Sequence, residues 1–158
     1  MNVRLGVSAS LAVLAAGLLG CGQNDDPAGA KDLYGRIHQG TGYRAWSRAP
    51  GFASRKPSFT SHSDAVEIFV DPNVQKALEG PDLITQWPVG SIIVKESYAN
   101  STRNLLAVME KKPDGTWFWA EYNADGKTLF SGKPDVCIEC HDNRKGYSDW
   151  VYSIEMPR

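Results

Sequence analysis

The sequence has little net charge, few cysteines and no long apolar run beyond its first 20 residues. Its 17 basic side chains nearly balance its 18 acidic ones, giving a formal net charge of −1. Binding to nucleic acid needs a clustered positive excess, so this balance argues against a nucleic-acid partner. It also argues against attachment to anionic lipid by charge alone. The length of 158 residues fits one domain and excludes a barrel enzyme.

The N-terminal segment is typical of a signal peptide. Arg4 precedes residues 5–20, which carry no charge and are too few to span a membrane comfortably. The segment ends in Leu18-Leu19-Gly20-Cys21, which resembles a lipobox, where a cysteine receives lipid after cleavage. We predict a lipoprotein signal peptide over 1–20 and lipidation of Cys21, with a plainly cleaved signal as the alternative. The mature protein is then expected on the periplasmic side, anchored to a membrane (the outer one) by lipid, or free in the periplasm.

The mature chain is predicted to hold a tether and one folded domain. Residues 21–32 are polar and are expected to form a flexible tether, which leaves 33–158 for the domain. Residues 33–46 contain three glycines, so any helix there is short or interrupted. Further along, loops are expected at 48–63 and 81–88.

The middle of the domain reads as a strand, a helix and a β-meander. A strand over 65–70 precedes a helix with Asp71 as its N-cap, Pro72 at its first position and Gly80 past its end. Three more strands are separated by turn sequences and lie at 91–98, 105–111 and 116–122. The sequence therefore predicts an α+β domain, with an antiparallel meander sheet and short flanking helices.

The clearest motif is Cys137-Ile138-Glu139-Cys140-His141, a C-x-x-C-H sequence, which is the attachment signal for c-type haem. Two cysteines three positions apart lie on one side of a helical turn, where both sulfurs can reach the vinyl groups of one porphyrin. The histidine that follows can place its imidazole under the iron as the proximal ligand. We predict covalent haem c on Cys137 and Cys140, with His141 as the axial ligand.

The motif also occurs in two other kinds of site, a dithiol redox pair and a zinc site. A dithiol redox pair would open a helix early in a βαβ unit, whereas this motif lies 18 residues from the end of the chain. A zinc site would need another ligand, and only His38 and His62 remain among the histidines. If Cys21 carries lipid, the cysteine count also excludes a disulfide framework.

The sixth coordination position decides between an electron carrier and a ligand-binding haem. Met109 falls in a predicted strand and is expected to be a core residue. Met156 lies in an irregular tail and is the more credible methionine ligand. His62 lies in a loop, where it could reach the iron or simply be solvated.

The chain resembles the cytochrome P460 and cytochrome c′-beta family. The resemblance rests on several segments between residues 59 and 154, in the family's order: Ser61 to Asp71, Trp87 to Glu96, Trp117 to Tyr122 with Asp125-Gly126, Cys137 to His141, and Ser148 to Tyr152. It implies a β-rich monohaem protein, commonly a homodimer, with five-coordinate iron.

The same resemblance singles out Lys95. In cytochromes P460 a lysine at the place of Lys95 is bonded covalently to the porphyrin, and those proteins oxidise hydroxylamine and related nitrogen species. The c′-beta relatives lack the bond and bind nitric oxide or carbon monoxide. Strand alternation places Lys95 on the face of Ile93 and Ser97, so its amine points either to the haem edge or into water.

Three functions therefore stay open. The leading hypothesis is a haem protein with an open distal site that binds or oxidises small nitrogenous molecules, working with a redox partner protein. The second is a periplasmic electron-transfer cytochrome in which His62 or Met156 fills the sixth position. The third is a haem-based gas sensor or scavenger without turnover.

Overall fold

The computed structural model describes residues 25–157. The predicted signal peptide and Cys21 lie outside this range. Within it, no helix has the length and apolar character that a membrane crossing requires.

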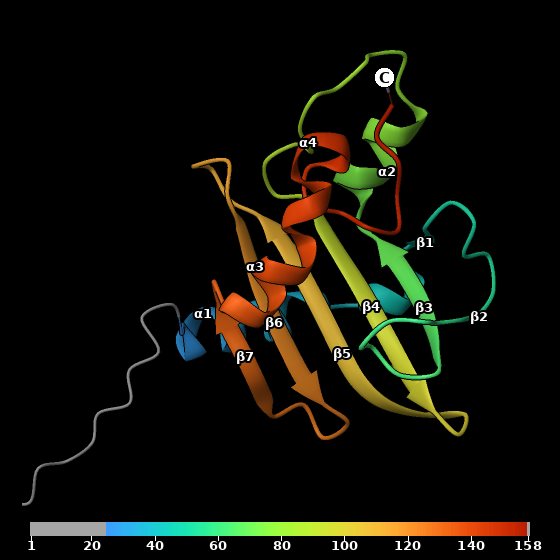
Figure 1. Ribbon diagram of the computed structural model, residues 1–158, viewed down its shortest axis with the longest axis vertical. Coiled ribbons are helices and arrows are strands. Elements are labelled where there is room, and N and C mark those ends of the chain that lie inside the picture. The colour runs from blue at the N-terminus through green and yellow to red at the C-terminus, as the bar shows by residue number, and fades with distance from the viewer. Residues whose placement is uncertain (1–24, 158) are drawn as a thin grey trace, which may run out of the picture.

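The described residues form one antiparallel sheet with short helices on both of its faces (Figure 1). The strands follow the order β1-β3-β4-β5-β6-β7, and β2 pairs with β3. Their bounds are β1 Ser47–Arg48, β2 Lys56–Pro57, β3 Ala65–Val70, β4 Ile92–Ala99, β5 Thr102–Lys111, β6 Trp117–Asn123 and β7 Thr128–Gly132. The prediction of an α+β domain built on an antiparallel meander is confirmed.

The helix after β3 has the predicted ends. Helix α2 spans Pro72–Glu79, and the Asp71 carboxylate accepts a hydrogen bond from the Val74 amide at 3.1 Å. The same carboxylate oxygen accepts from the Ile92 amide, also at 3.1 Å. Asp71 therefore caps the helix and ties its start to β4.

Helix α1 corrects the predicted tether. It spans Pro27–Ile37 and begins at an Asp26 N-cap, so residues 27–32, expected to be flexible, are helical. Its buried residues Leu33 and Ile37 pack with apolar side chains on one face of the sheet. Figure 1 shows α1 behind the strands, on the side away from α3 and α4. The folded unit therefore begins about six residues earlier than the sequence indicated.

Three strands differ from the sequence prediction. Strands β1 and β2 lie inside or beside the expected loop at 48–63, and β7 extends the meander by one strand. Both β1 and β2 hold two residues each, which is too short for a periodic pattern to be visible.

The C-terminal elements cover the opposite face. Helix α3 (Asp135–His141), the 3₁₀ turn η2 (Asp142–Arg144) and helix α4 (Lys145–Ser148) lie in front of the sheet in Figure 1. A second core lies on this side and includes residues of α2, of the strands and of the tail. Because both faces are covered, β4 and β6 carry buried side chains at nearly every position.

Candidate functional site

The C-x-x-C-H motif forms most of helix α3. Pro134 stands at the N-cap, and its carbonyl oxygen accepts from the Cys137 amide at 3.0 Å. Cys137 is half-buried, Cys140 is exposed, and His141, the last residue of the helix, is 8% exposed. All three residues line one pocket between α3 and the sheet.

The floor of this pocket consists of two rows of side chains that cross the sheet. Register places Ile93, Met109 and Trp119 opposite one another in one row. Lys95, Ala107 and Glu121 form the next row, two residues along each strand, which is about 7 Å. The apolar row carries Trp119, whose ring lies edge-on to His141 with centroids 4.7 Å apart.

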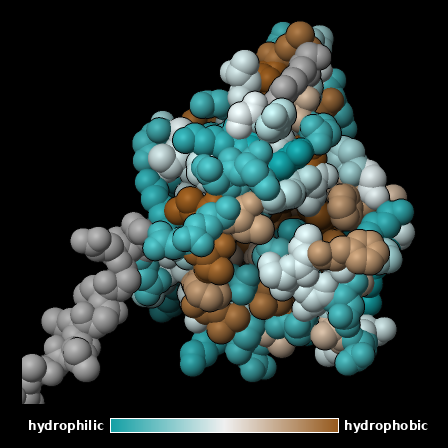
Figure 2. Space-filling view, viewed as in Figure 1, coloured by the Kyte–Doolittle hydropathy of each residue, from teal (hydrophilic) through white to brown (hydrophobic). Residues whose placement is uncertain are grey.

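The pocket is large and open on one side. Its empty space, with the open mouth included, is about 990 Å³. The rim adds Phe130, Val136 and Tyr152 to the residues already named. Figure 2 shows apolar side chains gathered around a hollow on this face of the molecule. A bulky, mostly apolar ligand fits such a site.

The imidazole of His141 is held in one orientation. Its Nδ1 lies 2.6 Å from the Trp150 carbonyl oxygen, which only accepts, so Nδ1 carries the hydrogen and Nε2 has a free lone pair. The Tyr152 ring packs edge-on from another side, with centroids 5.1 Å apart. Burial lowers the pKa of His141 to about 4, against the opposing effect of the Trp150 hydrogen bond. The ring is therefore neutral at pH 7, as an iron ligand must be.

These residues fit haem c. Covalent haem attachment needs two cysteines one helical turn apart, a neutral histidine with a free Nε2, and an apolar hollow beside them, and all of these are present.

The zinc site and the dithiol redox pair fit less well. Among residues 25–157, no group of three or more His, Cys, Asp or Glu side chains could hold a metal ion. Burial raises the pKa of Cys137 to about 11, whereas a redox-active thiol needs a lowered one.

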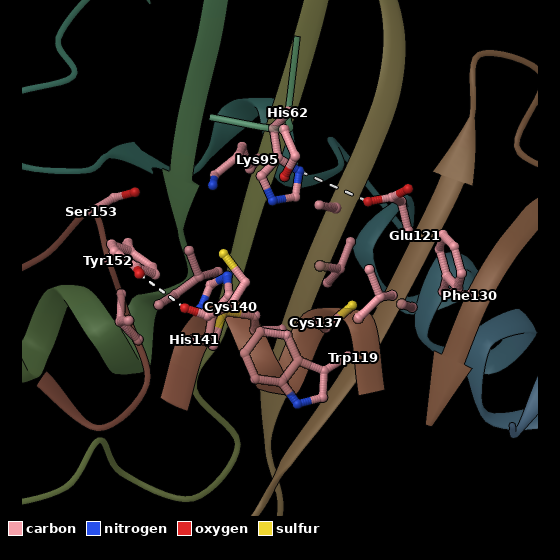
Figure 3. A pocket seen from close by; sticks show the side chains of 18 residues that line it. His62, Lys95, Trp119, Glu121, Phe130, Cys137, Cys140, His141, Tyr152 and Ser153 are labelled. Atoms are coloured by element: carbon pink, nitrogen blue, oxygen red, sulfur yellow. Dashed lines mark hydrogen bonds and ion pairs between the residues drawn. The ribbon is translucent and has the colours of Figure 1, made fainter. Parts of the chain in front are cut away.

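Lys95 points into the pocket, which is one of the two orientations that strand alternation allowed (Figure 3). Burial lowers its pKa to about 8, while the negative charge of Glu121 works in the opposite direction. A larger share of the amine is therefore neutral at pH 7 than in a solvated lysine.

His62 and Glu121 share the polar part of the pocket with Lys95. The loop that precedes β3 brings His62 to within 3.8 Å of Glu121, measured from Nδ1 to Oε2. Burial lowers the pKa of His62 to about 3, aided by the charges of Lys95 and His141, so His62 is neutral. Burial raises the pKa of Glu121, and the charge of Lys95 partly offsets that rise. Figure 3 shows His62 and Lys95 at the end of the pocket away from Cys137 and His141.

Sequence reasoning missed Glu121. The signal was present, because Glu121 lies two residues after Trp119 on the same strand and therefore on the same face.

The two methionines considered as sixth ligands take different places. Met109 lines the pocket, opposite Trp119 in the register of β5 and β6. Met156, the more credible methionine from sequence, is 7% exposed and packs in the core behind this region, outside the residues that line the pocket. The structure therefore brings His62, and not Met156, to the pocket.

The chain was compared with known families, curated proteins and solved structures. The family model described as cytochrome P460 matches residues 40–153, which include the loop of His62, the meander and the C-x-x-C-H helix. No curated protein and no solved structure matches.

Proposed function

The chain belongs to the cytochrome P460 family, whose members bind haem c, and we propose that it is an exported monohaem cytochrome that binds or oxidises small nitrogen species such as hydroxylamine or nitric oxide. One observation carries this proposal. A single pocket combines the attachment cysteines and the oriented His141 with a separate polar group formed by His62, Lys95 and Glu121.

The residues on the α3 side of the pocket would hold the cofactor. Cys137 and Cys140 would form the thioether bonds, and Nε2 of His141 would bind the iron. When bound, haem supplies a redox-active iron with one further coordination position. Trp119 and Tyr152 pack against the imidazole and keep its plane fixed.

The polar group suits a small molecule with both N–H and O–H groups. Neutral His62 can donate from one ring nitrogen and accept at the other. Glu121 lies 3.8 Å from His62, and the raised pKa of its carboxyl makes it a better proton acceptor than a solvated glutamate. Hydroxylamine must lose protons as it is oxidised, so a carboxylate and an imidazole side by side support oxidation as well as binding.

An electron-transfer role is the alternative, and His62 is the observation that favours it. The His62 ring is neutral and lines the pocket, so it could bind the iron as a sixth ligand. The nearness of Glu121 favours the open-site function instead, because an imidazole and a carboxyl group 3.8 Å apart can both contact one small molecule.

Absorption spectra of the ferric and ferrous holoprotein separate these functions. We expect high-spin bands, a resting spectrum unchanged by His62→Ala, and rapid binding of nitric oxide to the ferrous form. Low-spin bands that become high-spin in His62→Ala would identify His62 as a ligand and favour electron transfer. Met156→Leu serves as the matched control, because Met156 lies in the core and not on the pocket wall.

Turnover separates an enzyme from a gas binder or sensor. We expect hydroxylamine-dependent reduction of an artificial electron acceptor by the purified holoprotein. Binding of nitric oxide without such reduction would leave a gas-binding protein as the better account.

We also propose export, a lipid anchor and self-association. The lipobox-like sequence before Cys21 supports lipidation, and stable anchoring requires more than one acyl chain. Cys21→Ser should move the protein from the membrane fraction to the soluble fraction, and an unaltered protein that is already soluble would contradict the anchor.

Light scattering of the mature domain tests the expected homodimer.

A further inference from the structure

A buried ion pair lies behind the proximal side of the pocket. Lys111, the last residue of β5, places Nζ 2.9 Å and 2.7 Å from the two carboxylate oxygens of Asp149. The two side chains are 1% and 6% exposed. Apolar residues often replace such a pair with no loss of stability, because burying two charges costs about as much as their attraction returns. Stability alone is therefore a weak reason for the pair.

The pair holds a turn in an unusual conformation. Asp149 and Trp150 are consecutive residues with positive φ, 48° and 73°. Such conformations cost on the order of 1–3 kcal/mol for residues other than glycine and persist where the surroundings fix them. Here the Asp149 carboxylate also accepts from the Trp87 amide at 3.0 Å, and the Asp149 carbonyl accepts from Trp117 Nε1 at 2.9 Å.

The turn presents one group to the functional site. The Trp150 carbonyl oxygen accepts the hydrogen of His141 Nδ1 at 2.6 Å. A hydrogen bond of this kind fixes the tautomer of a metal-binding histidine and makes its other nitrogen a stronger donor to the metal. The strength of that effect depends on where the carbonyl stands, and the carbonyl belongs to one of the two residues with positive φ.

We propose that the Lys111–Asp149 ion pair is a positioning device that sets how strongly His141 binds the haem iron. Lys111 and Asp149 are not among the residues that line the haem pocket and would act only through the carbonyl of Trp150. The inference rests on haem binding at His141 and not on the nitrogen chemistry proposed above.

The test uses three variants of the holoprotein and one control. Lys111→Met and Asp149→Asn each remove one charge, and the double variant removes both without changing the local net charge. Asparagine suits the site because it tolerates positive φ. Lys112→Met is the matched control, because Lys112 adjoins Lys111 in sequence but is 40% exposed and pairs with Glu110.

The readouts are the iron–histidine stretching band of the ferrous protein and the reduction potential. We expect the band at lower wavenumber in all three variants and unchanged in Lys112→Met. Loss of a charge alone would move the potential in opposite directions in the two single variants. In the double variant, where net charge is unchanged, we expect a higher potential, because a weaker histidine donor stabilises ferric iron less.

The possible results distinguish the role of the ion pair from haem binding and from the proposed nitrogen chemistry. A double variant with the band and potential of the unaltered protein would overturn it. If a single variant does not fold, the double variant, which leaves no unpaired buried charge, still decides. If the iron proves six-coordinate, the reduction potential is the readout. An unaltered protein without covalent haem would overturn the haem premise and the inference together, whereas a haem protein that binds no nitrogen species would overturn only the proposed function.

Discussion

At the scale of single residues, the amine of Lys95 has the most direct consequence for the chemistry. It points into the pocket beside Glu121, and burial lowers its pKa to about 8. A neutral amine is a nucleophile, whereas a protonated one is not. Because a lowered pKa raises the neutral fraction, we expect Lys95 to be able to form the porphyrin bond that the family resemblance implies.

We predict that Lys95 is bonded to the porphyrin in the mature holoprotein. The bond from Nζ to a porphyrin carbon replaces one hydrogen on each atom and passes two electrons to an oxidant of the peroxide class. A peptide map should recover the Lys95 peptide joined to the haem peptide of Cys137 and Cys140, and Lys95→Arg should separate them. A Lys95 peptide free of haem would indicate a c′-beta-like gas binder.

Most individual site residues could be predicted from sequence, for a simple reason. Cys137, Cys140 and His141 are adjacent in the chain, so local spacing alone describes their geometry. Lys95 could be assigned to one face by alternation, but which face is covered by α3 depends on the whole fold. The position of His62 depends on a loop without periodicity, and its approach to Glu121 could not be read from the sequence.

At the scale of elements, helix α1 closes the face of the sheet opposite the pocket. Leu33 is fully buried against that face, and Tyr122 of β6 donates a hydrogen bond to the Ala30 carbonyl at 2.6 Å. At the turn after β6, Gly126 has φ of +81°, and a Cβ there would meet Tyr34 Oη at 2.6 Å. The helix and the turn are therefore fitted to one another.

We predict that Leu33→Ala lowers the free energy of unfolding by about 3 kcal/mol, because it leaves a cavity under α1. Urea titration followed by circular dichroism measures the change. Lys31→Ala, on the exposed side of the same helix, should change it by less than about 0.5 kcal/mol. An equal, small effect of both substitutions would mean that α1 contributes little to the fold, as the predicted tether implied.

The elements that could be predicted are those whose ends are marked by residues with strong backbone preferences. Strand β3 and helix α2 match their predicted ranges, because Asp71, Pro72 and Gly80 mark helix ends by their backbone preferences. Helix α1 was missed because its first turn, with Pro27, Gly29 and polar neighbours, has the composition of a linker, and only packing on the sheet makes it helical. Strand β7 was missed because it lies at the sheet edge and its middle residues are exposed.

At the scale of the whole molecule, the sheet separates two different environments. Neighbouring residues of β4 point to opposite faces, so Lys95 enters the haem pocket while Glu96 enters a network of tyrosine and arginine side chains on the side of α1. A change on one face can therefore be made without direct contact with the other. That separation allows the stability of the domain to be tested independently of its haem chemistry.

The Glu96 network gives a prediction for the stability of the molecule as a function of pH. Glu96 is 1% exposed and accepts hydrogen bonds from Tyr43, from Tyr98 at 2.5 Å and from Arg44 at 2.8 Å. Burial raises the pKa of Glu96, but these hydrogen bonds and the Arg44 charge outweigh it and hold the pKa below its ordinary value. The carboxylate therefore stabilises the fold fully above the unfolded-state pKa of about 4.3, and the effect is lost as pH falls through the lower folded-state value.

We expect Glu96→Gln to lower the free energy of unfolding by about 2 kcal/mol at pH 7, because hydrogen bonds to a charged group are replaced by weaker ones. The difference from the unaltered protein should shrink below about pH 4, where protonated Glu96 resembles glutamine. Burial raises the pKa values of Asp71 and Glu121, so their effect on the free energy of unfolding depends on pH in the opposite direction. Both groups are present in the variant and in the unaltered protein, so their effect cancels when the two free energies are subtracted. Glu79→Gln, on the exposed side of α2, should show no such difference at either pH. A Glu96→Gln difference that stays constant from pH 7 to pH 3 would mean that the charge of Glu96 does not stabilise the fold.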